Sequence, residues 1–214
     1  MIVKNWMSKN PITISSDLLA KEAMDMFEEH KVPFLSVVDD EQFRGLLAKR
    51  DLFEAASWAV STQDIFEIQY FNERLKVRDI MVRMPVTLSV NDTMETALDK
   101  GKQFTRSFLP VMDGNKLVGT LSNRDFIHTL NQILGVDEDL HGVAVEINDN
   151  SKGTIKEVIE EIFAMGLEIK GLFTLKNPDS QKQRLLIRFE TKCLSKITAL
   201  LEEKNYKIIE VEKP

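Results

Sequence analysis

The 214-residue sequence predicts a mixed α+β protein. Three observations carry this prediction: an internal repeat without gaps, a β-α-β-β-α order inside each copy, and a β-α-β-β-α-β order after residue 140. Helical stripes and short β-branched runs alternate throughout, as expected where helices cover sheets. The chain therefore reads as two copies of one α/β unit followed by a ferredoxin-like α+β domain.

The repeat has an offset of 74 residues. It aligns residues 7–51 with 81–125, and 14 of these 45 positions are identical. Two unrelated segments of average composition would share roughly three. Twelve of the shared positions form three groups, named here by their first-copy members: Met7, Pro11, Thr13 and Ser15; Phe34, Leu35, Val37 and Asp39; Gly45, Leu47, Arg50 and Asp51. The match indicates a duplicated structural unit.

Each copy predicts the same elements in the same order. A β-branched strand follows the Pro (12–14 and 86–88), and a helix, two strands (34–38 and 43–48 in the first copy) and a last helix near Arg50 or Arg124 follow it. The second copy joins its strands by Asp113-Gly114-Asn115, a strong hairpin signal. The first helix of each copy has an i, i+3, i+4, i+7 stripe, which is Ala20, Ala23, Met24 and Phe27 or Met94, Ala97, Leu98 and Gly101. Its start is predicted at Ser16 or Asp17 in one copy and at Asp92 with Glu95 in the other.

The C-terminal pattern predicts a strand at 143–147, strands at 167–175 and 185–189, and a closing strand at 207–211. Two amphipathic helices lie between them, with the apolar faces Ile155, Val158, Ile159, Ile162 and Phe163, and Leu194, Ile197, Leu200 and Leu201. This order is the split β-α-β arrangement of ferredoxin-like domains.

Composition excludes several classes of protein. The net charge is −6, so the chain lacks the basic surface that a nucleic-acid backbone requires. The single Cys193 excludes an intrachain disulfide framework and fits a reducing compartment. No run approaches the 18 or so apolar residues of a membrane span. We expect a cytoplasmic protein without membrane or nucleic-acid partners.

The tandem unit resembles a pair of CBS domains, a Bateman module, through residues 7–13, 34–39 and 45–51 and their partners in the second copy. The resemblance implies two units packed through their sheets, with clefts that hold adenine nucleotides or S-adenosyl compounds. The turn at 149–153 with the following helix and Gly166 resembles an ACT domain. This order resembles the AcuB family of acetoin-utilisation proteins. The predicted domains are CBS units at 1–56 and 77–135, a helical connection at 57–76 and an ACT-like domain at 140–214.

The strongest ligand signal is the turn 119–125, which matches the CBS pattern Gly-x-x-Ser/Thr-x-x-Asp. The resemblance places the Asp125 carboxylate on ribose, while a helix start and Ser122 suit a phosphate. An alternative interpretation is that Ser122 and Asp125 cap the next helix and bind no ligand. The predicted nucleotide site comprises Val86, Thr87, Phe108, Ser122, Asn123, Arg124 and Asp125.

A second possible nucleotide site comprises Ile12, Thr13, Phe34, Lys49, Arg50 and Asp51. It has Ala48 where the family pattern has a hydroxyl, so it lacks one phosphate donor. Candidate ligands are AMP, ADP, ATP, adenosine and S-adenosylmethionine. CBS pairs that bind phosphates often have Arg or His where this chain has Pro33-Phe34 and Ser107-Phe108, so the resemblance favours ligands of low charge, such as AMP, adenosine or S-adenosylmethionine, over ATP. A possible ACT ligand loop comprises Asp149, Asn150 and Gly153.

No catalytic or metal-binding set is predicted, because His30, His128 and His141 lack metal spacing and no nucleophile lies near a base. No obligatory cofactor is expected. The favoured interpretation is a non-enzymatic, ligand-sensing regulatory protein, a homodimer whose adenine ligand alters its contacts with a protein partner of unspecified identity. Two alternatives stay open: a structural dimer module with degenerate sites, or a small accessory protein of acetoin or acetyl-unit metabolism.

Overall fold

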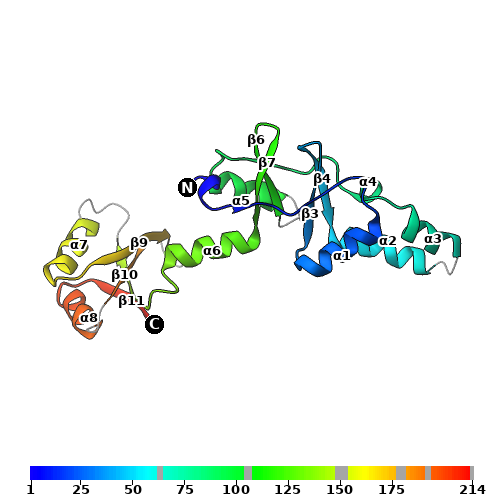
Figure 1. The fold of residues 1–214 in the computed structure, drawn as a ribbon. Helices are drawn as coiled ribbons and strands as arrows, with labels where there is room; N and C mark the ends of the chain where they lie inside the picture. The colour runs from blue at the N-terminus through cyan, green and yellow to red at the C-terminus, as the bar shows by residue number, and fades with distance from the viewer. Residues whose placement is uncertain (62–64, 104–107, 148–153, 177–181, 191–193, 213–214) are drawn as a thin grey trace. The chain divides into compact units, whose positions relative to one another are not determined.

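The computed structural model describes residues 1–61, 65–103, 108–147, 154–176, 182–190 and 194–212. Its contacts divide the chain into an N-terminal unit, Met1–Phe126, and a C-terminal unit, Ile127–Pro214. Both are mixtures of helices and strands, so the predicted α+β class is confirmed (Figure 1). No helix in the described ranges is long and apolar enough to cross a membrane.

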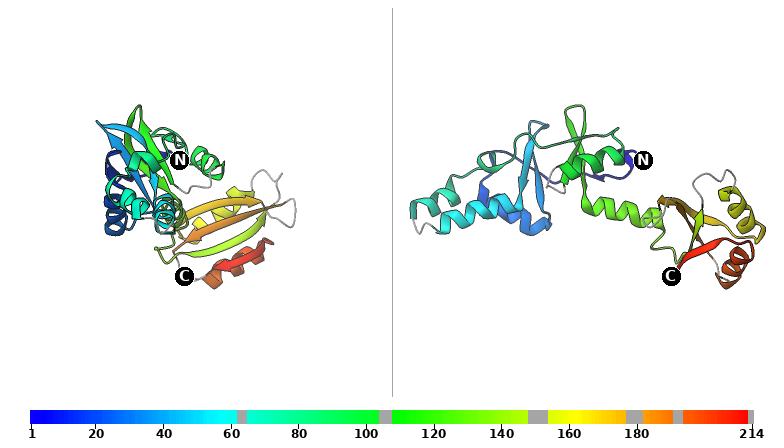
Figure 2. Two further views of the ribbon diagram at one scale, coloured as in Figure 1. Left: turned by 90° about the vertical axis from the view of Figure 1, so that its right-hand side faces the viewer. Right: turned by 180° about the vertical axis from the view of Figure 1, so that it is seen from behind.

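The N-terminal unit holds two small sheets, one for each repeat, and α6 begins in it (Figures 1 and 2). In chain order its elements are η1 (Val3–Asn5), β1 (Ser8–Lys9), β2 (Thr13–Ile14), α1 (Ala20–His30), β3 (Phe34–Asp39), β4 (Gln42–Ala48), α2 (Lys49–Ser61), α3 (Ile65–Glu73), α4 (Val77–Ile80), β5 (Leu88–Ser89), α5 (Met94–Gln103), β6 (Phe108–Asp113), β7 (Lys116–Ser122) and α6 (Asn123–Leu134). The first sheet has the order β2-β3-β4 and the second β1-β7-β6-β5. Each copy therefore has the predicted strand-helix-strand-strand-helix order.

The first residues of each repeat, 7–11 and 81–85, are called here its lead-in segment. Each lead-in segment pairs with the sheet of the other repeat. Strand β1, from the start of the chain, pairs with β7 of the second repeat, where Ser8 lies opposite Thr120. In return Val82, near the start of the second repeat, exchanges backbone hydrogen bonds of 2.8 and 3.0 Å with Leu46 on β4. Because Ser8 and Val82 are 74 residues apart, as are Leu46 and Thr120, the two crossings are equivalent.

The duplicated glycines lie at these crossings. A Cβ atom at Gly45 would overlap the carbonyl oxygen of Val82, and one at Gly119 would lie 2.7 Å from the carbonyl oxygen of Ser8. Contacts this close need a residue without a side chain. The two glycines thus let each lead-in segment lie directly on the sheet of the other repeat.

The hydrophobic core of each repeat also contains a residue from the segment that leads into the other repeat. Val3 is fully buried with the second repeat's apolar residues, and Val77 is fully buried with those of the first. The helix stripes are buried largely as predicted, because Ala20, Ala23 and Phe27 have no exposed surface. The prediction is wrong for Leu98, which is 46% exposed.

Both helix starts differ from the predicted ones. The amide of Leu19 donates to the Glu22 carboxylate at 3.0 Å, so α1 begins after Leu19, whereas Asp17 instead pairs with basic residues from the connection. At α5 the hydroxyl of Thr93 accepts the Thr96 amide at 3.2 Å. The sequence placed these caps one to three residues too early, because several short polar side chains precede each helix and each could cap it.

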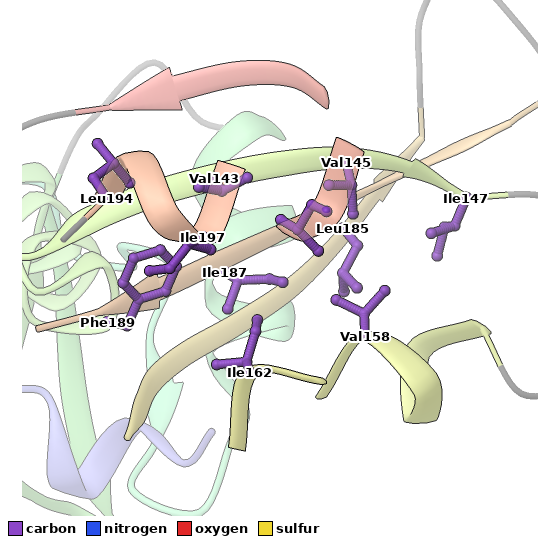
Figure 3. Close-up of a cluster of buried hydrophobic side chains, with 11 residues drawn as sticks. Val143, Val145, Ile147, Val158, Ile162, Leu185, Ile187, Phe189, Leu194 and Ile197 are labelled. Carbon is purple, nitrogen blue, oxygen red and sulfur yellow. The ribbon is translucent and has the colours of Figure 1, made fainter. Parts of the chain in front are cut away.

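The C-terminal unit has the predicted β-α-β-β-α-β order. Its elements are β8 (His141–Ile147), α7 (Thr154–Ala164), β9 (Ile169–Lys176), β10 (Gln183–Phe189), α8 (Leu194–Glu203) and β11 (Lys207–Glu212). The antiparallel sheet has the order β11-β8-β10-β9. Figure 3 shows alternate side chains of β8 and β10 meeting those of α7 and α8, so both helices cover one face of the sheet. Phe163, predicted on this apolar face, is 56% exposed, and that prediction is wrong.

Candidate functional site

A cavity of about 920 Å³ lies within the N-terminal unit. Residues from both repeats line it. They include the two turns at which a strand leads directly into a helix, from β4 to α2 and from β7 to α6. The lining residues are Ser8, Lys9, Asn10, Pro11, Ile12, Lys31, Val32, Pro33, Phe34, Ala48, Lys49, Arg50, Phe108, Thr120, Ser122, Asn123, Arg124 and Asp125. This volume is in the range of small-molecule sites.

Asp125 is held by hydrogen bonds from both repeats. Its Oδ2 atom accepts the Ser122 amide and the Ser122 hydroxyl, each at 2.6 Å. Its Oδ1 atom accepts the hydroxyl of Ser8 at 2.6 Å. The Ser122 amide bond is one half of a capping box, and the Asp125 amide completes it by donating to Ser122 Oγ at 3.4 Å. Asp125 therefore both caps α6 and lines the cavity.

Two aromatic rings lie in the wall between the turns. Phe34 and Phe108 stack on each other with ring centroids 5.0 Å apart and planes inclined by 23°. Both residues are half-buried at the start of equivalent strands. The rings give the cavity an apolar wall on which a flat group could pack.

Basic side chains surround the cavity. Lys49 pairs with Glu28 at 2.7 Å, and Arg50 lies 3.5 Å from Asp51. Within the described parts of the chain, the other three bases of the cavity wall form no ion pair; they are Lys9, Lys31 and Arg124. The sequence favoured a ligand of low charge, but the wall brings together more positive than negative charge, which suits an anionic ligand.

The cavity takes residues from both predicted nucleotide sites. From the first set it holds Phe108, Ser122, Asn123, Arg124 and Asp125, and from the second Ile12, Phe34, Lys49 and Arg50. It does not include Val86, Thr87, Thr13 or Asp51. The cavity thus brings residues 8–12 of the first repeat together with the turns of both repeats, whereas the sequence grouped Val86 and Thr87 with the second turn.

Thr87 lies at a different cavity of about 560 Å³. There its carbonyl oxygen accepts Lys100 Nζ at 3.1 Å, and the same ammonium lies 3.0 Å from Asp92. Burial raises the pKa of Asp92, but hydrogen bonds from Lys100 and the Ser89 amide outweigh it and hold the pKa below the usual value. This ion pair ties α5 to the strand region of Thr87, which the sequence analysis included in the predicted nucleotide site.

Sequence reasoning missed the cavity residues of the lead-in and of the segment before β3. Ser8, Lys9 and Lys31 are among them, and Thr120 on β7 was missed as well. The shared Gly45 and Gly119 mark close backbone approach, but nothing in the sequence says which segment approaches. The possible ACT ligand loop, Asp149, Asn150 and Gly153, lies outside the described residues, as does Cys193.

Within the described ranges, no group of three or more His, Cys, Asp or Glu residues could hold a metal ion. His128 instead lies 3.2 Å from Gln132 on the same helix.

Comparison with known proteins shows the family of the N-terminal unit. A family model for the CBS domain matches residues 3–57 and again residues 77–132, together more than half of the chain. The chain belongs to the CBS-domain family. The predicted tandem pair is therefore confirmed, and residues 133–214 lie outside both matches.

Two curated proteins are similar in sequence. An uncharacterised protein of Methanocaldococcus jannaschii is 24% identical over 155 residues, which are 72% of this chain and 80% of that protein. A homoserine O-acetyltransferase of Methanococcus vannielii is 28% identical over 131 residues, which are 60% of this chain but 25% of that enzyme. The second similarity covers only a quarter of the enzyme's length.

Three solved structures share the fold. A protein assigned to acetoin utilization (AcuB) from Vibrio cholerae has a TM-score of 0.53 at 17% identity, covering 64% of this chain and 96% of that one. CBSX2 in complex with AMP has a TM-score of 0.52 at 23% identity, covering 62% and 97%. The CBS domain pair of protein MJ0100, in complex with 5′-methylthioadenosine and S-adenosyl-L-methionine, has a TM-score of 0.50 at 22% identity, covering 61% and 96%.

Proposed function

We propose that this chain is a ligand-sensing regulatory protein that binds an adenine nucleotide or adenosyl compound in the cavity between its two CBS repeats. The observation that carries the proposal is the Asp125 carboxylate, held in the wall of a 920 Å³ cavity beside the start of α6. Pairs with the same fold bind AMP, S-adenosylmethionine and 5′-methylthioadenosine, which share an adenosine group. Binding would alter the packing of the repeats and so the contacts with a protein partner.

The proposed pose follows the chemistry of the wall. The ribose lies at Asp125, whose carboxylate accepts hydroxyl groups. The base packs near the stacked Phe34 and Phe108. A phosphate lies toward the amide groups at the start of α6, where the helix dipole and Arg124 favour negative charge.

The charge of the wall favours the phosphate-bearing candidates, AMP, ADP and ATP, over adenosine and S-adenosylmethionine. Lys9, Lys31 and Arg124 all line the cavity and form no ion pair within the described ranges. A charge-assisted hydrogen bond is roughly twice as strong as a neutral one. A ligand with more phosphates therefore gains more from these side chains.

The proposed protein is not an enzyme. CBS domains are typically regulatory, and among the described residues the cavity wall contains no His, Cys or Glu to act as a nucleophile or base beside Asp125. Two alternatives make different predictions. A structural module with degenerate sites would bind no adenosine compound. An accessory protein of acetoin or acetyl-unit metabolism would bind a different ligand.

For the C-terminal unit we propose an ACT-like domain that serves mainly to form a homodimer. Its β11-β8-β10-β9 sheet with two helices on one face supports this proposal. The proposed boundaries are 1–56 and 77–135 for the CBS domains, 57–76 for the helical connection and 140–214 for the ACT-like domain. A cytoplasmic location remains part of the proposal.

Calorimetry on the full chain tests the function. We expect AMP, ADP or ATP to bind, and Asp125→Ala to weaken the binding at least tenfold, because a hydrogen bond to a charged group contributes about 1.5–3 kcal/mol. Ser36→Ala, which removes a buried hydroxyl away from the cavity, is the control and should bind like the wild type. If no adenosine compound binds, or if Asp125→Ala binds as tightly as the wild type, the site is refuted.

A further inference from the structure

Ser8 reaches Asp125 from the other repeat. The Ser8 backbone is held in β1 opposite Thr120, and its hydroxyl donates to Asp125 Oδ1 at 2.6 Å. The two residues are 117 positions apart in the chain. This contact exists only because the lead-in segment of the first repeat crosses onto the sheet of the second.

The contact fixes the carboxylate on its second side. Ser122 holds Asp125 Oδ2 through its amide and its hydroxyl, both at 2.6 Å. Ser8 holds Oδ1, so hydrogen bonds from two directions set the plane of the carboxylate before a ligand arrives. A group fixed in this way loses less entropy when it binds a partner.

The other end of the cavity lacks both hydroxyl groups. The residue equivalent to Ser8 is Val82, and the residue equivalent to Ser122 is Ala48. Val82 occupies the same place as Ser8, because its backbone pairs with Leu46 as Ser8 pairs with Thr120. The two ends of the duplicated module therefore differ at the two positions whose hydroxyl groups hold Asp125.

We propose that Ser8 is a positioning residue that orients Asp125 for ribose, and that Ser8 and Ser122 together make the Asp125 end the tighter of two unequal nucleotide sites. The proposal rests on the proposed function of the cavity. It assigns a role in binding to the lead-in segment, which the family pattern around Gly119 and Asp125 does not include.

The test measures AMP and 2′-deoxy-AMP binding by calorimetry. In the wild type we expect AMP to bind more than tenfold tighter, because the deoxy compound lacks one donor for Asp125. Ser8→Ala should weaken AMP binding about tenfold and reduce the preference for AMP to roughly threefold. Ser8→Thr should keep both values, because the hydroxyl donor is retained.

Ser89→Ala is the matched control. Ser89 is an exposed serine in another two-residue strand, and it does not line this cavity. We expect wild-type binding from it. If Ser8→Ala weakens both ligands equally and leaves the preference unchanged, Ser8 is only structural and the positioning role is refuted.

A second variant tests the inequality of the two ends. Ala48→Ser with Val82→Ser places both hydroxyl groups at the first turn. At AMP concentrations that fill only the tighter site of the wild type, this double variant should bind two AMP per chain instead of one. Unchanged stoichiometry would overturn this part of the inference. A wild type that binds no AMP overturns the proposed function and the inference together, whereas AMP binding that depends on Asp125 but not on Ser8 overturns the inference alone.

Discussion

Replacing Gly45 by alanine tests the exchange of lead-in segments on which the cavity depends. A Cβ atom at this position would overlap the carbonyl oxygen of Val82 and lie 3.2 Å from the Cα atom of Arg83. Both neighbours are backbone, so they cannot turn aside as the end of a side chain can. The lead-in segment must instead shift by roughly 1 Å, as overpacked sites do.

The cost follows from what the shift breaks. Val82 and Leu46 exchange two backbone hydrogen bonds, at 2.8 and 3.0 Å. Each contributes about 1 kcal/mol, and overpacking adds about 1–3 kcal/mol. We therefore expect Gly45→Ala to lower the free energy of unfolding by about 3–5 kcal/mol. Gly119→Ala should cost less, because one of its two nearest atoms is the flexible Met7 Sδ.

The free energy of unfolding of each variant is measured by urea unfolding, followed by tryptophan fluorescence. Trp6 and Trp58, the two tryptophans of the chain, both lie in the N-terminal unit. The control is Gly101→Ala on α5, where no heavy atom lies within 4 Å of the added Cβ. It should stabilise by about 0.5–1 kcal/mol, because alanine is the better helix residue. If Gly45→Ala is as stable as the wild type, the close crossing is wrong.

Two further predictions concern the same unit. Glu41 has a left-handed φ of 62° in the turn between β3 and β4, so Glu41→Gly should raise the free energy of unfolding by about 0.5–1 kcal/mol in the same urea assay, and a loss of stability would contradict the strained turn. Asp92→Asn should lower the free energy of unfolding by about 1 kcal/mol at pH 7 because it removes the ion pair with Lys100. Since the folded pKa of Asp92 lies below its ordinary value of 3.8, the wild-type advantage is present above that pH and disappears as the pH falls through the folded pKa. A difference between the two proteins that does not shrink as the pH falls below 3.8 would refute the assignment.

The sequence predicted the element order well because periodicity and turn chemistry are local. The hairpin at Gly114, the strand from Phe34 and the helical stripe ending at Phe27 are all found within a residue or two. Exposure was harder to predict. Leu98 and Phe163 fit their stripes by spacing, yet about half of each side chain is exposed, because a stripe is wider than the surface that covers it.

The candidate site was predicted only in part. The turn holding Ser122 and Asp125 could be read from its pattern, since strand, turn and helix start are adjacent in the chain. Its pairing with Ser8 could not be read, because a duplicated chain offers two equivalent lead-in segments for each turn. Only the packed structure selects between them.

By itself, the sequence determined the duplication, the family, the order of elements and the residue types at each turn. The tertiary structure decided that the lead-in of one repeat crosses onto the other, which puts Ser8 beside Asp125 and leaves Thr87 at a different cavity. The physical reason is that local patterns specify which face of an element is buried, whereas the partner it meets depends on close backbone contacts such as those at Gly45 and Gly119.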